Sequence, residues 1–232
     1  MVHKEHNEFT SLITHQLREP LTNIKWVLSL LVNGEAGNLS SEQKELIGKA
    51  FRSGEHALAL IDDMLKADRI DSSTFDIYPV DSDFVEIVQK AFDELRTHAD
   101  QKKIQFTLKA DHKNTPLISI DPAHIGEAVL NLLENALHYT PQGGKVEALV
   151  AVEGNSVVFS VTDTGIGIPK EEISKISSRF FRATNAHTAN EHGSGLGLFI
   201  VRRIVERHGG TFGFESIEGS GSVFHISLPF KN

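Results

Sequence analysis

Two long stretches of apolar residues at helical spacing open the chain, and they limit the folds that it can adopt. In the first stretch, apolar residues recur every three or four positions, at Phe9, Leu12, Ile13, Leu17, Leu21, Ile24, Val27, Leu28 and Leu31. The second stretch repeats this spacing at Leu46, Ile47, Ala50, Phe51, Ala57, Leu58, Ile61, Met64 and Leu65. Such spacing places apolar side chains on one face of an amphipathic helix. We therefore predict two long helices.

The segment between these stretches predicts a short connection. Gly34 and Gly37 are suited to end the first helix, and Ser40 with Gln43 has the pattern of a capping box that begins the second. The helices then form an antiparallel hairpin over residues 1–70. A lone hairpin cannot cover so wide an apolar face, so we predict a homodimer in which two hairpins form a four-helix bundle. The alternative is that the helices pack on the chain's own second domain.

After a predicted linker at 71–80, helical and strand-like patterns alternate up to residue 232. Helical patterns occur at residues 83–103, 121–139 and 195–208. Strand-like runs occur at residues 104–110, 145–153, 156–163, 210–217 and 221–230. They do not follow a regular βαβ rhythm. We therefore predict an α+β fold, in which a domain at 81–232 has helices on one face of a mixed sheet, as an α/β two-layer sandwich.

Composition excludes several classes of function. A net charge of −8 argues against a nucleic-acid surface, which needs a basic patch. The chain has no cysteine, so disulfides, zinc–thiolate sites and thiol catalysis are excluded. No apolar run approaches the roughly 20 residues that span a bilayer. We expect a cytoplasmic protein, or the cytoplasmic portion of a longer sensor.

Three glycine-bearing segments lie in the second domain. "DTGIGIP" begins at Asp163, leaves a strand and turns sharply, which suits Gly165 and Gly167. "HGSGLGL" places Gly193, Gly195 and Gly197 where a helix starts, and free N–H groups there attract phosphate. "GSGSVF" at 219–224 is a predicted turn between strands. The second segment is neither a Walker loop nor a dinucleotide-binding fingerprint. Each segment alone is most simply a structural turn.

The helical segment "NLLENALHYTP" carries Asn131 and Asn135 one turn apart, so both amides lie on one face. Such a pair is usually only solvated. Beside the glycine segments, a better interpretation is a set of oxygen ligands for Mg²⁺, which binds few protein oxygens together with nucleotide phosphates.

In this order, "NLLENALHYTP", "DTGIGIP", "RFFR", "GSGLGL" and "GSGSVF" resemble the N, G1, F, G2 and G3 boxes of the sensor histidine kinases of two-component systems. "FTSLITHQLREPLTNIKW" resembles their H box and lies in the predicted hairpin. The resemblance covers nearly the whole chain. It implies a Bergerat-type ATP-binding fold for the second domain, behind a dimerisation and phosphotransfer hairpin.

The resemblance also implies roles for particular residues. Asp163 would accept a hydrogen bond from the adenine amino group, and Asn135 with Asn131 would bind the Mg²⁺ that bridges the ATP phosphates. The remaining nucleotide contacts would come from His138, Tyr139, Gly165, Gly167, Gly193, Gly195, Leu196 and Gly197. Residues 170–192 would form a lid anchored by Phe180 and Phe181. In that lid, Arg179 and Arg182 are candidates to stabilise phosphate charge, unless they only belong to a solvated loop.

His15 is the implied phosphoacceptor. A neutral imidazole has a lone pair near pH 7 and can attack phosphorus directly. Pro20 removes a helix N–H, so we expect a bend just below His15. Two neighbours depart from the family pattern: Gln16 replaces an acidic residue, and Glu19 replaces a Thr or Asn. In addition, His138 stands where a basic residue is common, and Ser177 with Ser178 replaces a Phe and an acidic residue.

Three hypotheses follow from this resemblance. The leading one is an ATP-dependent kinase that phosphorylates its own His15 and passes the phosphoryl group to an aspartate in the receiver domain of a response regulator. The second is a degenerate kinase, which binds ATP and partners with little turnover because of Gln16 and Glu19. The third is an ATPase or chaperone of the same superfamily, but the His-bearing hairpin counts against it.

Overall fold

The computed structural model describes the backbone of residues 2–35, 37–72, 75–189 and 193–230. Within these ranges, it describes all side chains except those of residues 2–15, 188 and 189. The chain divides into two compact units, Met1–Ser72 and Ser73–Asn232. Within the described residues, no helix is both long enough and apolar enough to cross a membrane.

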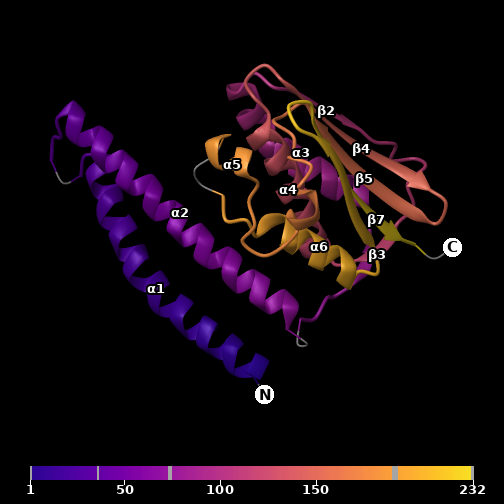
Figure 1. The fold of residues 1–232 in the computed structure, drawn as a ribbon, viewed down its shortest axis with the longest axis horizontal. Helices are drawn as coiled ribbons and strands as arrows, with labels where there is room; N and C mark the ends of the chain where they lie inside the picture. The colour runs from indigo at the N-terminus through magenta and orange to yellow at the C-terminus, as the bar shows by residue number, and fades with distance from the viewer. Residues whose placement is uncertain (1, 36, 73–74, 190–192, 231–232) are drawn as a thin grey trace. The chain divides into compact units, whose positions relative to one another are not determined.

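The first unit is a hairpin of two long helices, α1 (Val2–Val32) and α2 (Ser41–Asp71) (Figure 1). Two ion pairs link the antiparallel helices. Arg18 pairs with Asp62, and the Nζ atom of Lys25 lies 2.9 Å from Oε1 of Glu55. Pro20 lies inside α1. The two predicted helices are therefore confirmed.

The connection between α1 and α2 follows the predicted signals. Gly34 and Gly37 adopt positive φ angles of 79° and 112°, which glycine reaches without strain. Ser40 begins α2 as its N-cap: its hydroxyl accepts from the Gln43 N–H at 3.2 Å, and the Gln43 side chain accepts from the Ser40 N–H at 2.9 Å. This reciprocal pair is the predicted capping box.

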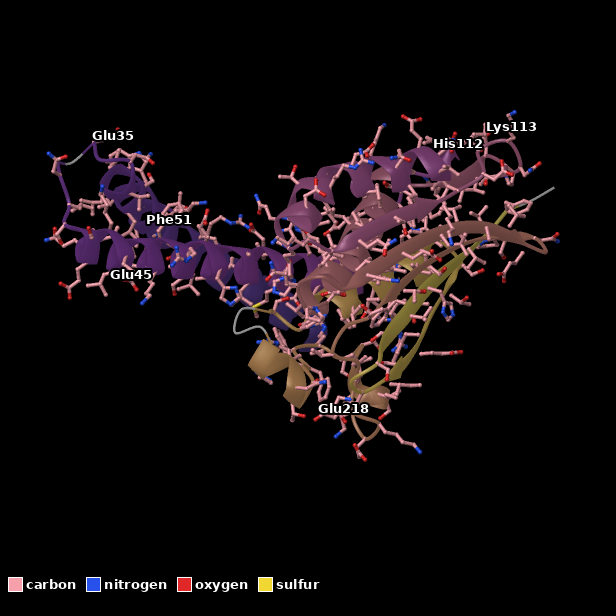
Figure 2. All side chains as sticks on the ribbon, turned by 90° about the horizontal axis from the view of Figure 1, so that it is seen from above. Glu35, Glu45, Phe51, His112, Lys113 and Glu218 are labelled. Atoms are coloured by element: carbon pink, nitrogen blue, oxygen red, sulfur yellow. The ribbon has the colours of Figure 1, made fainter. Side chains whose placement is uncertain are left out.

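Much of the apolar surface of the hairpin remains uncovered within a single chain. Leu17, Ile24 and Val27 on α1 are 48%, 52% and 49% exposed. Figure 2 shows the side chains of α2 in the same unit, including Phe51 and Glu45. The Phe51 ring is half-buried, and the Lys25 ammonium lies 5.7 Å from its centroid.

The second unit contains two sheets and the remaining helices. Its helices are α3 (Phe84–Gln101), α4 (Pro122–Tyr139), α5 (Thr184–Ala189), α6 (Gly197–Arg207) and a 3-10 turn, η1 (Ile173–Lys175). The main sheet has the strand order β2 (Gln105–Lys109), β4 (Lys145–Glu153), β5 (Ser156–Asp163), β7 (Gly221–Pro229), β6 (Thr211–Ile217). The β2–β4 pair is parallel and the other pairs are antiparallel. A small antiparallel sheet joins β1 (Val80–Ser82) to β3 (Ile118–Ile120).

Helices α3, α4 and α6 cover one face of the main sheet, as Figure 1 shows. Alternate residues of the central strands face these helices and are buried, for example Val157, Phe159 and Val161 on β5. The rings of Phe84 and Phe159 meet edge to face at 6.3 Å, linking α3 to the sheet. The predicted α+β fold with a two-layer domain is confirmed.

The structure differs from the sequence prediction in a few bounds. The predicted helix at 195–208 begins at Gly197, with Leu196 as its N-cap. The β1–β3 ribbon was not predicted, because three-residue strands show no alternation that a pattern search can detect. At the predicted linker of 71–80, α2 extends to Asp71 and β1 begins at Val80.

Candidate nucleotide site

Helix α4 presents the paired asparagines, and both of its ends are capped. At the N-terminus, Oδ1 of Asp121 accepts hydrogen bonds from the N–H groups of Ala123 and His124 at 3.1 and 3.2 Å. Pro122 follows as the first helical residue, as predicted. At the C-terminus, the Lys102 ammonium donates to the carbonyls of Leu137, His138 and Thr140 at 2.5, 3.1 and 2.9 Å. These contacts fix the helix on which Asn131 and Asn135 lie.

Asp121 also joins this helix to the segment that enters the second unit. Its Oδ2 accepts from the Tyr78 N–H at 3.0 Å. The Asp121 N–H donates to Nε2 of His208 at 3.0 Å, while Nδ1 of His208 lies 2.8 Å from the Ile204 carbonyl. Burial alone would raise the pKa of Asp121, but hydrogen bonds from Tyr78 and His124 lower it to about 2. Burial lowers the pKa of His208, in keeping with its role as an acceptor.

Asn131 and Asn135 lie against the first residue of α6. A Cβ atom added at Gly197 would be 3.0 Å from Oδ1 of Asn131 and 3.7 Å from Nδ2 of Asn135. The Asn131 Nδ2 donates back to the Glu127 carbonyl at 3.2 Å, so its Oδ1 is directed towards α6. Glycine at 197 therefore allows the N-terminus of α6 to approach both amides. The structure brings these three predicted site residues together.

Asp163, at the end of β5, is a buried carboxylate with only 6% of its surface exposed. Its Oδ1 accepts from the Gly165 N–H at 2.7 Å, and the Ser222 N–H of β7 also donates to the carboxylate. Burial raises the pKa of Asp163 to about 6, although both hydrogen bonds act in the opposite direction. A buried acceptor held in this way can recognise a polar ligand group.

The loop after Asp163 is packed too closely for side chains at two positions. A Cβ atom at Gly165 would lie 2.6 Å from both Oδ1 of Asp163 and the Tyr139 carbonyl oxygen. Gly167 has a φ of 62°, and a Cβ atom there would collide with the Ile217 carbonyl. The Ile166 N–H donates to the Tyr139 carbonyl at 3.2 Å, so this loop is tied to the C-terminal end of α4.

The turn between β6 and β7 supports the same loop from the other side. The Gly219 N–H donates to the Ile166 carbonyl at 2.8 Å. Gly221 has a φ of 111°, and a Cβ atom there would collide with the Asp163 carbonyl. This turn, predicted from "GSGSVF", is confirmed. Figure 2 places Glu218 in this turn at the opposite end of the second unit from His112 and Lys113.

The segment "RFFR" contacts the segment "GSGLGL" just before α6. A Cβ atom at Gly195 would lie 2.8 Å from the Phe180 carbonyl carbon, and one at Gly193 would lie 3.1 Å from Nε of Arg182. The Arg182 guanidinium also donates to the Ala186 carbonyl at 3.2 Å. Phe180 adopts a positive φ of 61°, which is strained for an aromatic residue. The contacts bring both "RFFR" and "GSGLGL" to the start of α6.

One lid residue, Phe180, is not placed as the resemblance implied. Phe180 is 58% exposed, so its ring does not anchor the segment in this structure, while Phe181 is half-buried. The Arg179 guanidinium lies 4.9 Å from the centroid of the Phe199 ring on α6. Arg179 therefore stacks on that aromatic ring from its exposed position.

The other predicted contacts lie close to these segments. Leu196 is buried and Tyr139 is half-buried, whereas His138 is exposed at the end of α4. The His138 and Tyr139 rings lie 5.7 Å apart, edge to face. In the hairpin, Gln16 and Glu19 are both exposed on α1. His15 is part of α1, but its side chain lies outside the described residues.

Two residues at the site were missed by sequence reasoning. Lys102, the residue that follows α3, caps α4, and Asn185 on α5 donates to the Gly167 carbonyl at 2.9 Å. Both bind main-chain carbonyls that are distant in sequence. Because a helical pattern or a glycine box does not indicate which distant carbonyl a side chain will reach, no local signal in the chain predicts these contacts.

Comparison with known proteins agrees with this arrangement. Residues 5–73 match the His kinase A (phospho-acceptor) domain family, and residues 120–232 match the family of histidine kinase-, DNA gyrase B- and HSP90-like ATPases. The second match covers the helix with the paired asparagines and all the glycine segments. Residues 120–232 therefore belong to an ATP-binding domain.

Individual relatives extend the similarity over both domains. The chain is 32% identical over 96% of its length to the circadian input-output histidine kinase CikA of Synechococcus elongatus, covering 30% of that protein. It is 31% identical over 98% of its length to the sensor histidine kinase WalK of Bacillus subtilis, covering 37% of that protein. The chain thus spans about a third of the length of these curated relatives.

A solved structure shows the same fold. The crystal structure of full-length ShkA in complex with AMPPNP superposes with a TM-score of 0.78 at 26% identity, covering 97% of this chain and 46% of that one. A helical phosphoacceptor hairpin followed by an ATP-binding two-layer domain defines a histidine kinase core. The chain belongs to the sensor histidine kinases of two-component signalling.

Proposed function

We propose that this chain uses ATP to phosphorylate its own His15 and then transfers the phosphoryl group to an aspartate in the receiver domain of a response regulator. The observation that carries the proposal is that the Asn131–Asn135 pair of α4 lies against the first residue of α6, while the loop after Asp163 is tied to the C-terminal end of the same helix α4. The same chain also carries the H box. In this proposal residues 1–70 are the phosphotransfer hairpin, 71–80 the linker and 81–232 the catalytic domain, all in the cytoplasm.

Adenine recognition is assigned to Asp163. When it is ionised, its carboxylate can accept hydrogen bonds but cannot donate them, and the adenine amino group is a donor. Two backbone N–H groups already orient the carboxylate, and the glycines at 165 and 167 leave the adjoining backbone bare of side chains. Tyr139 and His138 border the site from the end of α4.

Mg²⁺ is assigned to Asn135 and Asn131. The chemistry of the donors fits, since Mg²⁺ prefers oxygen ligands and the Asn131 Oδ1 is directed towards α6. The ion would supply charge neutralisation for the phosphates. The N–H groups of Gly195 and Gly197 at the start of α6 would bind phosphate oxygens, as helix N-termini commonly do. The Leu196 N–H donates to Oγ of Ser194 at 3.1 Å and would exchange this contact for phosphate.

Arg182 and Arg179 are assigned to the charge that develops on the transferring phosphoryl group. Arg182 is adjacent to Gly193 and is therefore better placed than Arg179, which stacks on Phe199. An arginine beside the phosphates stabilises charge without any proton transfer.

In the hairpin, a lone pair on the neutral His15 imidazole attacks the γ-phosphorus of ATP. An N–P bond forms, the bond to the bridging oxygen breaks, and ADP leaves. The imidazole then loses its remaining ring proton to solvent or to a nearby base. Gln16 can orient the ring but cannot remove that proton, whereas Glu19 lies one helical turn away and carries a carboxylate. We infer slow autophosphorylation and weak phosphatase activity.

The hairpin is assigned a second role as a dimer interface. Apolar side chains of α1 that are about half exposed would be covered in a four-helix bundle with a second copy.

The test of the proposal is incubation of the chain with γ-labelled ATP and Mg²⁺. We expect acid-labile, alkali-stable label on the protein, and none on a His15→Gln variant that still binds ATP. Subsequent addition of a receiver domain should move the label to the regulator.

The absence of label on a protein that binds ATP would instead support a degenerate kinase, a second function that the replacements at Gln16 and Glu19 favour. Label on the His15→Gln variant would show that another residue accepts the phosphoryl group.

A further inference from the structure

Asn185, in the first turn of α5, connects that helix to the loop after Asp163. Its Nδ2 donates to the Gly167 carbonyl at 2.9 Å and makes a longer contact of 3.4 Å to the Ile166 carbonyl. The side-chain Oδ1 of Asn185 is buried and, within the described residues, accepts no hydrogen bond. A buried acceptor without a partner is unfavourable, so the orientation of this amide is determined by its donor group.

The loop that receives these hydrogen bonds is held from two other sides. The Ile166 N–H is bonded to the Tyr139 carbonyl of α4, and the Ile166 carbonyl accepts from the Gly219 N–H of the β6–β7 turn. The end of α4 and the β6–β7 turn, which both border the proposed nucleotide site, thus fix the loop after Asp163. Asn185 therefore ties α5 to a fixed point of the domain.

A second contact secures the start of α5. The Thr184 N–H donates to Oε2 of Glu172 at 2.9 Å. The alanines on either side of this turn, Ala183 and Ala186, are buried. With Asn185, these contacts set both the position and the rotation of the first turn of the helix.

The same turn of α5 binds Arg182. The Arg182 guanidinium donates to the Ala186 carbonyl at 3.2 Å, and its Nε lies 3.1 Å from the position of a Cβ atom at Gly193. A continuous series of contacts therefore runs from the Gly167 carbonyl through Asn185 and Ala186 to Arg182.

We propose that Asn185 is a positioning residue for phosphoryl transfer: by tying α5 to the loop after Asp163, it holds the Arg182 guanidinium beside Gly193. The proposal rests on the function proposed above for Arg182. It concerns the catalytic step rather than ATP affinity, because Asn185 contacts protein carbonyls.

The test uses the full chain with Asn185→Asp, which keeps the size of the side chain and removes its donors. We expect the rate of His15 phosphorylation at saturating ATP to fall about 10- to 100-fold, as expected when a catalytic group is misplaced. Affinity for a non-hydrolysable ATP analogue should change less than about threefold. A matched control, Asn155→Asp in the exposed β4–β5 turn, makes the same charge change and should leave both quantities unaltered.

Asn185→Leu separates the loss of the donor from the added charge, and it should reproduce the lower rate. A double-mutant cycle then tests the route through Arg182: in an Arg182→Ala background, Asn185→Asp should have no further effect on the rate. Independent, additive effects would overturn the proposal, as would a wild-type rate in either Asn185 variant.

A measurement that does not depend on catalysis distinguishes a failure of this proposal from a failure of the proposed function. Hydrogen exchange of the backbone amides of residues 184–187 should be faster in Asn185→Asp than in wild type. If the wild-type chain incorporates no phosphate, the proposed function fails while this measurement still tests the contact. Unchanged exchange would show that Asn185 does not hold α5.

Discussion

At the scale of single residues, Asp163 combines two opposing properties. In the proposed function its carboxylate accepts a hydrogen bond from adenine, most strongly when it is ionised, yet burial raises its pKa to about 6. The unliganded domain therefore keeps a charge in a place where a charge is unfavourable. Such a residue stabilises the complex with ligand at the expense of the free protein.

We predict that Asp163→Asn weakens ATP binding by about 5- to 150-fold, because an amide directed at the adenine amino group leaves a buried donor unpaired, at ~1–3 kcal/mol. Titration calorimetry measures the change. Affinity equal to that of wild type would mean that adenine is recognised elsewhere.

The raised pKa of Asp163 also predicts how the stability of the unliganded domain depends on pH. A carboxyl whose pKa rises from 3.8 to about 6 on folding contributes stability below pH 4 that is lost as the pH rises through 6. The shift corresponds to about 3 kcal/mol. The melting temperature of Asp163→Asn should therefore rise relative to that of wild type between pH 4 and pH 7. A constant difference between the two melting temperatures would contradict the raised pKa.

The H box makes a second prediction at this scale. Gln16 and Glu19 are both exposed on α1, so substitutions there alter chemistry with little effect on packing. Gln16→Glu supplies a proton acceptor next to His15 and should speed autophosphorylation by up to about 10²-fold, the lower range for a general base. The rate of label incorporation is the measurement.

Variants of Glu19 complete the comparison. Glu19→Gln should slow phosphorylation if that carboxylate now takes the proton, and Glu19→Thr should raise phosphatase activity towards the regulator. If Gln16→Glu reacts at the wild-type rate, proton removal at this position does not limit the reaction.

At the scale of elements, the site depends on how closely α6 approaches α4. We predict that Gly197→Ala weakens ATP binding, because its Cβ would lie 3.0 Å from Oδ1 of Asn131 and force the amide or the helix to move. Overpacking of this kind typically costs ~1–3 kcal/mol. Calorimetry with an ATP analogue measures the change in affinity, and thermal unfolding measures the change in stability.

Gly126→Ala in α4 is the matched control. A Cβ atom there meets Cγ2 of Ile87 at 3.6 Å, an ordinary contact. This substitution should stabilise the domain by up to about 1 kcal/mol through helix propensity and leave ATP affinity unchanged. Equal behaviour of the two variants would show that the contact with Asn131 is unimportant.

Elements with strong local patterns were predictable from the sequence. The capping box at Ser40, the Asp121–Pro122 helix start and the glycine turns all have short-range chemical signals, and the structure confirms them. Contacts between side chains and distant carbonyls were not predictable. Lys102 and Asn185 make such contacts, and nothing in their neighbouring residues requires them.

At the scale of the whole molecule, the exposed apolar face of the hairpin predicts self-association. We expect light scattering at micromolar concentration to give twice the mass of one chain. Replacing both Ile24 and Val27, which are 52% and 49% exposed, by aspartate should convert the protein to a monomer, because paired helices would bury the new charges.

Leu117→Asp serves as the control for this experiment. Leu117 is 63% exposed in the second unit, so the same kind of substitution there should leave the mass unchanged. A wild-type protein with the mass of one chain would refute the predicted dimer.

The contacts of Asp121 bear on where the second unit can be joined to other proteins. The Tyr78 N–H is one of its hydrogen-bond donors, and the Phe75 ring packs edge to face on His124 at 4.8 Å, so residues that precede the first strand already belong to the folded domain. A chimera whose fusion joint falls between Phe75 and Val80 would keep every strand of the sheet and still lose contacts at the start of α4. The portable module therefore begins at or before Phe75, earlier than the boundary at residue 81 that was proposed from the sequence, and a fusion joint should be placed before Phe75.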